Sequence, residues 1–210
     1  MNLVLFPSEA VMVFGDNFAG GQTGHEGISF AARLQRSLKR GRPGLQVYCL
    51  DILGEMTNAM PTRFCSEAPR RYHEKNVLVF WGGFKDTGVS ESGRLPVTSG
   101  SVFQANMRTL LQKIPERITV FVLGFYSIDG NKTNPWPITG MRYDAGRVLD
   151  FNGILRAVTE GRTNSFFVPT AHLIKLQDLV ADGVHLTPRG YGKVVRMLAP
   201  RIREQLDAQT

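Results

Sequence analysis

Short apolar runs alternate with longer segments of helical periodicity along the chain, and this alternation restricts the fold more than any other feature. The apolar runs predict strands at Val11–Gly15, Gln46–Leu53, Val77–Gly82, Ile118–Gly124 and Ser165–Pro169. The periodic segments predict helices near Ile28–Lys39, Ala59–Tyr72, Ser99–Lys113, Ala145–Glu160 and Pro188–Ala208. Strands that alternate with helices form a parallel sheet covered on both faces. We therefore expect a three-layer α/β/α sandwich.

The length of 210 residues predicts one domain, spanning 1–210, because most domains hold about 100 to 200 residues. The formal charge of +7 would suit a polyanion. The basic residues, however, fall in three separate amphipathic segments whose charged faces would normally meet water. We therefore expect a small-molecule ligand and no nucleic acid, and the sequence leaves the oligomeric state open.

The sequence also bears on location. The N-terminus lacks the basic segment of a secretory signal, and no apolar run reaches the roughly 20 residues that a membrane helix needs. Cys49 and Cys65 provide no disulfide framework, which fits a reducing compartment, and we expect both thiols to be buried and inert. These features predict a cytoplasmic protein that does not enter the membrane.

Polar residues follow each predicted strand, at the sheet edge where open parallel sheets bind their ligands. They are Asp16 and Asn17, Gly54 and Glu55, Gly83 to Asp86, and Asp182 with His185. The fourth strand is followed by an aperiodic segment from Phe125 to Asp144, and connections of this length are usually functional or disordered. Its aromatic residues favour a lid or substrate wall, with a packed structural loop as the alternative. We assign substrate contacts to Asp16, Gly83, Asp86, Tyr126 and Trp136.

The segment "DGVH" predicts a general base. A carboxylate three residues before a histidine, in a turn set by Gly183, can reach the imidazole and fix its tautomer. Asp182 and His185 occupy these positions after the fifth strand. The alternative is a turn that only caps the last helix.

Other chemistries lack their signatures. The stretch "GDNFAGGQTG" contains neither G-x-G-x-x-G nor Gly-Lys-Ser/Thr, so neither a dinucleotide nor a phosphate loop is supported. The four histidines are scattered, without the close spacing of a zinc site. We therefore expect no cofactor and no metal.

Four blocks carry a resemblance to a known family. "VMVFGDN", "LGEMTNAMPTRF", "VLVFWGGFKD" and "DGVHLTPRGYG" resemble, in order and spacing, the SGNH (GDSL) hydrolases, a family of esterases and acylhydrolases. The resemblance runs from about Val11 to Leu198 and is most specific in the last block. It implies the flavodoxin-like SGNH fold, with a five-stranded parallel sheet in the order 2-1-3-4-5.

The resemblance assigns roles unevenly. Asp182 and His185 match the family's catalytic acid and base, and Gly54 matches the glycine whose N–H helps to bind the oxyanion. Two positions differ: Asn17 stands where the nucleophilic serine belongs, and Lys85 stands where an oxyanion-binding asparagine belongs. A lysine is also a donor, so Lys85 is either an oxyanion donor or an ion-pair partner of Asp16 or Asp86.

The replacement of the serine bears directly on mechanism. A carboxamide has no proton whose removal yields a competent nucleophile near neutral pH, so acyl-enzyme chemistry at Asn17 is disfavoured. One function compatible with this is an altered enzyme in which His185 activates water or a substrate group. The other is a binding protein on a hydrolase scaffold. A third, less favoured reading is a covalent esterase that uses another hydroxyl, with candidates Thr23, Thr57 and Thr87.

Overall fold

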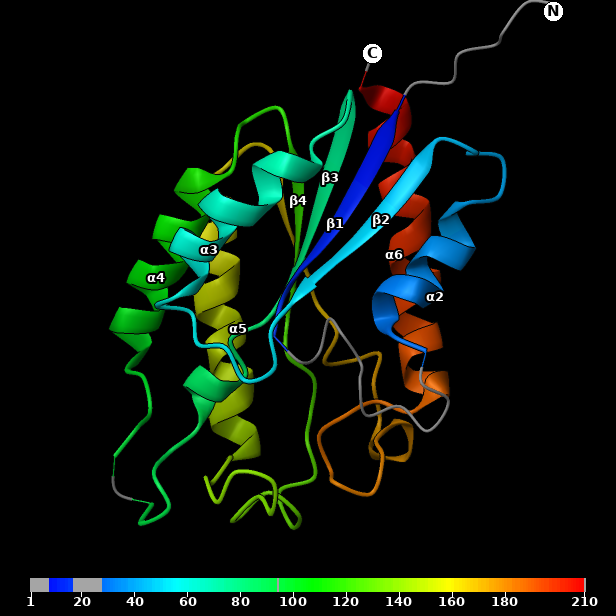
Figure 1. Ribbon diagram of the computed structural model, residues 1–210. Coiled ribbons are helices and arrows are strands. Elements are labelled where there is room, and N and C mark those ends of the chain that lie inside the picture. The colour runs from blue at the N-terminus through cyan, green and yellow to red at the C-terminus, as the bar shows by residue number, and fades with distance from the viewer. Residues whose placement is uncertain (1–7, 17–27, 94, 210) are drawn as a thin grey trace, which may run out of the picture.

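The structure of the chain, a computed structural model, describes residues 8–16, 28–93 and 95–209. A five-stranded parallel sheet forms its centre, in the order β2-β1-β3-β4-β5 (Figure 1). The strands are β1 (Glu9–Gly15), β2 (Leu45–Asp51), β3 (Lys75–Trp81), β4 (Thr119–Leu123) and β5 (Ser165–Val168). The expected sheet and its order are confirmed.

Helices cover both faces of the sheet, which completes the expected three layers (Figure 1). One face carries α2 (Phe30–Leu38) and α6 (Pro188–Ala208). The other carries α3 (Met60–Glu67), α4 (Gly100–Lys113) and α5 (Ala145–Glu160). Three short 3₁₀ helices, η1 (Ala68–Arg71), η2 (Lys85–Thr87) and η3 (Leu176–Asp178), lie in the connections.

Local capping explains where the helices begin. A side-chain oxygen just before the helix accepts an N–H of the first turn, which would otherwise lack a partner. Ser29, Ser99, Asp144 and Thr187 do this for α2, α4, α5 and α6. The predicted helix Ala59–Tyr72 is shorter than expected because Pro69 cannot donate to the α-helical ladder, so the chain continues as η1.

The two cysteines correct the sequence-based expectation, because both are exposed. Cys49 lies on β2, which is an edge strand and leaves part of its surface uncovered, whereas β1 is buried throughout. Cys65 lies on the solvent side of α3. Within the described residues, no helix is long and apolar enough to cross a membrane.

Candidate active site

A cavity of about 350 Å³ is lined by residues that follow the carboxyl ends of the strands. These strand ends point to the lower end of the molecule in Figure 1. Five residues predicted for the site line the cavity: Asp16, Gly54, Lys85, Trp136 and His185. The other lining residues are Leu53, Phe84, Ile138, Thr139 and Tyr143. The sheet edge therefore brings together side chains that are up to 169 positions apart, as its topology requires.

His185 lines this cavity and forms a close pair with Asp182, which does not line it. His185 Nδ1 lies 2.5 Å from Asp182 Oδ2, and the backbone N–H groups of Val184 and His185 donate to Asp182 Oδ1 at 2.8 and 2.9 Å. Burial of the Asp182 carboxyl acts to raise its pKa, but these hydrogen bonds outweigh burial and hold the pKa below its usual value. An ionised Asp182 favours the tautomer that carries its proton on Nδ1, and Nε2 is then the ring nitrogen that can accept a proton.

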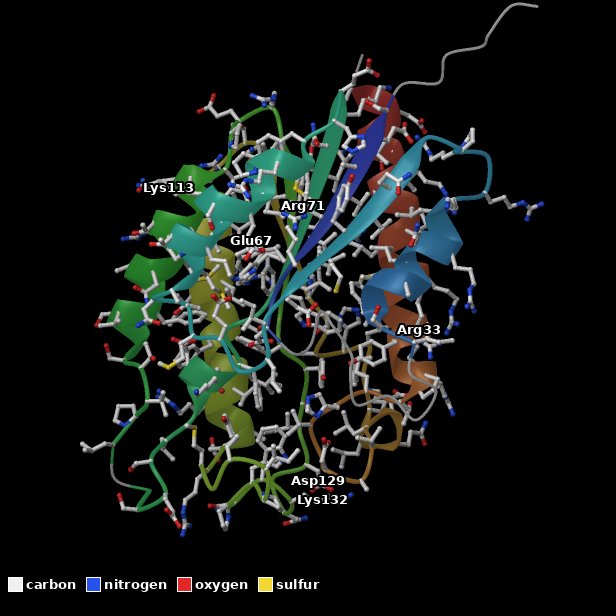
Figure 2. All side chains as sticks on the ribbon, in the orientation of Figure 1. Arg33, Glu67, Arg71, Lys113, Asp129 and Lys132 are labelled. Carbon is white, nitrogen blue, oxygen red and sulfur yellow. The ribbon has the colours of Figure 1, made fainter. Side chains whose placement is uncertain are left out.

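The turn that carries this pair packs against the segment after β4. Gly183 has φ +77°, and a Cβ there would lie 2.9 Å from Lys132 Cβ, so the turn requires glycine. The N–H of Asp129 donates to Gly183 O at 2.8 Å. Figure 2 shows Asp129 and Lys132 at this lower end of the molecule, where their side chains lie 3.5 Å apart. Two further contacts hold the turn: Tyr126 Oη donates to Val184 O, and Trp136 Nε1 donates to Asp182 O.

A second carboxylate, Asp178, joins the start of α6 to the segment before this turn. The sequence reasoning did not predict it. Its side chain is fully buried and lies 2.5 Å from Lys193 Nζ on α6, while its carbonyl accepts the N–H of Thr187 at 2.8 Å. Burial acts to raise the pKa of Asp178, but the Lys193 ammonium and the N–H of Lys175 hold it below its usual value. This ion pair fixes the start of α6 against the turn that bears His185.

At the end of β1, the sequence Gly15-Asp16 has a structural explanation. A Cβ on Gly15 would lie 2.0 Å from Trp81 O, so only glycine permits β1 and β3 to approach this closely. Asp16 then accepts the N–H of Phe84 at 2.9 Å, which ties the end of β1 to the loop after β3. Asn17, the next residue, lies outside the described residues, as does Thr23.

Three residues predicted to contact substrate do not line the cavity, and they support its walls instead. Asp86 is fully buried and accepts hydrogen bonds from Thr57 and Thr98. Its pKa is raised by burial, against the effect of these bonds. Tyr126 is buried and donates to Val184 O in the turn that bears His185. The third residue, Gly83, has φ +88°, and a Cβ there would lie 2.7 Å from the Phe103 ring. This position therefore requires glycine for packing.

Lys85 faces the cavity, unlike its neighbour Asp86, which is buried in the protein. Its side chain lines the cavity and is half-buried. Among the described carboxylates none forms a salt bridge with Lys85, so the pairing considered for Asp16 and Asp86 is not observed.

The other two hydroxyls considered as nucleophiles serve as structural groups. Thr57 Oγ1 donates to Asp86, and Thr87 Oγ1 donates to Phe84 O at 2.7 Å. Both residues are buried, and neither lines the cavity.

The segment from 125 to 144 contributes a wall of the cavity through Trp136, Ile138, Thr139 and Tyr143. The Tyr143 ring stacks on Phe84 at 4.5 Å, and Trp136 meets both rings edge to face. The Trp136 ring also lies 5.8 Å from the His185 ring. The segment is therefore both packed and part of the cavity, so the two alternatives do not exclude each other.

Arg63 on α3 was missed by the sequence reasoning. Its guanidinium pairs with Glu55 at 2.5 Å, donates to Leu50 O at 3.0 Å and Gly15 O at 3.2 Å, and lies 4.1 Å above the Phe14 ring. Arg63 thus joins the ends of β1 and β2 to the loop that carries Gly54. The local signal in the sequence was the spacing of four positions between Arg63 and Glu67, which indicates an ion pair on one helix face.

No group of three or more His, Cys, Asp or Glu residues in the described part of the chain could hold a metal ion.

Solved structures of esterases and acylhydrolases share this architecture. A catalytic mutant of the acetylxylan esterase Axe2 from Geobacillus stearothermophilus matches with a TM-score of 0.70 at 17% identity, covering 95% of this chain and 96% of that one. A lipase/acylhydrolase from Enterococcus faecalis gives 0.64 at 18% identity, over 92% of this chain and 96% of that one. The chain has the SGNH hydrolase fold.

A carbohydrate acetylesterase family member from Sinorhizobium meliloti gives a TM-score of 0.67 at 14% identity, over 95% of this chain and 99% of that one. Comparison of the sequence with protein-family models and with curated proteins finds no match. At these identities the likeness concerns the fold, and the chemistry must be argued from the cavity itself.

Proposed function

We propose that the chain is a hydrolase of the SGNH type that cleaves a small ester or acyl compound without a serine nucleophile. The observation that carries this proposal is the Asp182–His185 pair, with 2.5 Å between Oδ2 and Nδ1, in which His185 lines the cavity of about 350 Å³. A carboxylate that orients a histidine at a ligand cavity is the arrangement of a general base.

The proposed step uses water as the nucleophile. His185 Nε2 takes a proton from water as the water oxygen adds to the ester carbonyl carbon. The resulting oxyanion accepts the N–H of Gly54, which lines the cavity and donates to no acceptor among the described residues. As the alcohol leaves, it takes the proton from His185, so that ester and water give acid and alcohol.

The experiment compares His185→Ala with the unmodified chain on p-nitrophenyl esters of increasing acyl length. We expect His185→Ala to lower kcat by about 10²–10⁴-fold and to leave the affinity for substrate nearly unchanged, because a general base acts in the transition state. His172→Ala is the matched control, since His172 is exposed and does not line the cavity. Hydrolysis that persists undiminished in His185→Ala would contradict the role of His185.

A fluorophosphonate probe tests the absence of a covalent step. We expect no labelling of the unmodified chain and some labelling of Asn17→Ser, because the hydroxyl restores a group that His185 can activate. Stoichiometric labelling of the unmodified chain at any hydroxyl would show that a covalent mechanism operates.

A second candidate function, a binding protein on the same scaffold, is favoured by one observation: Asn17 replaces the nucleophile that the family uses. Mass spectrometry of a metabolite extract incubated with the chain separates the two. Retention of a compound without its conversion indicates a binder, and conversion that requires His185 indicates an enzyme.

A further inference from the structure

Lys85 brings a positive charge into a cavity whose walls are mainly apolar. Apolar side chains supply half of the lining, namely Leu53, Phe84, Trp136, Ile138 and Tyr143. Lys85 enters this surface from η2, directly after β3, and its side chain is half-buried. Walls that exclude water lower the local dielectric constant and strengthen the attraction between an ammonium group and an anion.

The carboxylates around the cavity are already held by the chain. Asp16 lines the cavity and accepts the N–H of Phe84, and Asp182 is bound by His185. Asp86, next to Lys85 in sequence, accepts two threonine hydroxyls. In the described ranges no salt bridge involves Lys85, so its ammonium can pair with an anionic group of a ligand.

The mouth of the cavity is apolar as well. Leu53 and Ile138 line it while they are 67% and 57% exposed, and a ligand that covers them removes apolar surface from water. A substrate rich in hydroxyls would leave many of these groups without partners against such walls, which is unfavourable. The lining therefore favours a ligand with an apolar body.

We propose that the cavity binds an acyl compound that has an apolar body and a negatively charged group, and that Lys85 binds the charged group. This inference rests on the proposed function for the bond that is cleaved. It assigns Lys85 to substrate recognition and not to the oxyanion, for which the N–H of Gly54 remains available.

Two esters matched in length test the proposal: p-nitrophenyl hexanoate, and the mono-p-nitrophenyl ester of adipic acid, which adds a terminal carboxylate. We expect the unmodified chain to favour the adipate ester in kcat/KM by about 10- to 100-fold, since hydrogen bonds to charged groups have this strength. Lys85→Met should remove this preference, and Lys85→Arg should retain most of it. Ile138→Ser should lower kcat/KM for both esters.

Three outcomes would overturn the proposal: no preference in the unmodified chain, an equal loss for both esters in Lys85→Met, or no effect of Ile138→Ser. The equal loss would assign Lys85 to the oxyanion. Lys113→Met is the matched control, because Lys113 is exposed at the opposite end of the molecule, as Figure 2 shows. It should leave the preference unchanged.

Binding measurements keep this proposal separate from the catalytic one. The anilide of adipic acid carries the free carboxylate, the anilide of hexanoic acid does not, and an amide replaces the ester in both. Calorimetry should show tighter binding of the adipic anilide to the unmodified chain by about 10-fold or more, and no such difference in Lys85→Met. If neither ester is hydrolysed, the catalytic proposal fails, and this pair of ligands alone decides the role of Lys85. Equal affinity for both anilides would refute it.

Discussion

Replacing Arg63 with methionine tests how the cavity is assembled. The substitution keeps an unbranched side chain over Phe14 but leaves Glu55, whose side chain is 8% exposed, without its cation. It also leaves Gly15 O and Leu50 O without this donor. Removing one partner of a buried ion pair costs about 3–5 kcal/mol. At about 2–4 °C per kcal/mol for a chain of this size, Tm should fall by about 6–20 °C.

Thermal unfolding followed by circular dichroism measures this change. Arg36→Met is the matched control, because Arg36 is an exposed residue of α2, and it should shift Tm by no more than about 2 °C. The double variant Arg63→Met/Glu55→Gln should lose less stability than the sum of the two single variants, since the unpaired charge is gone. A Tm drop below about 3 °C for Arg63→Met, or strict additivity, would refute the reasoning.

Three further predictions concern the turn that carries His185. Asp182→Asn should lower kcat for ester hydrolysis by about 10²–10⁴-fold with little change in the circular dichroism spectrum, because it removes the charge that stabilises a protonated His185; unchanged kcat would contradict this. Gly183→Ala should lower the free energy of unfolding, measured in urea, by about 1–3 kcal/mol, because it forces a side chain onto a positive φ; a neutral effect would show that the turn relaxes. Asp178 and Asp182 have pKa values lower in the folded chain than the roughly 3.9 of an unfolded one, so they stabilise the fold above that value and this stability is lost as pH falls through their folded pKa values. The free energy of unfolding should therefore fall between about pH 5 and about pH 2, and less steeply in Asp178→Asn; an equal slope would indicate that other carboxyls dominate.

The sequence was sufficient for the elements of the fold because the signals that set them are local. The helix Ala145–Glu160 begins and ends as predicted, since its cap Asp144 immediately precedes it. Asp16, Gly54, Lys85 and His185, which were predicted for the site from their positions after the strands, line one cavity.

The same reasoning could not say which residues after a strand face the ligand. Asp86 follows β3 as closely as Lys85 does, but it points into the protein, where Thr57 and Thr98 bind it. The contacts of Arg63 were missed because its acceptors come from distant parts of the chain: Gly15 lies 48 positions away. Such pairings depend on the packing of α3 against the strand ends, which no local pattern encodes.

The two tryptophans of the chain divide between core and cavity, and this division gives each of them a separate optical signal. Trp81 is fully buried and meets the Phe30 ring at 5.0 Å, whereas Trp136 lies in the cavity wall beside His185. In a Trp81→Phe variant, the single remaining indole would report the arrival of an unlabelled ligand in the cavity that Trp136 lines. In a Trp136→Phe variant, emission would follow only the opening of the core. The chain thus carries its own fluorescent reporters of occupancy and of unfolding.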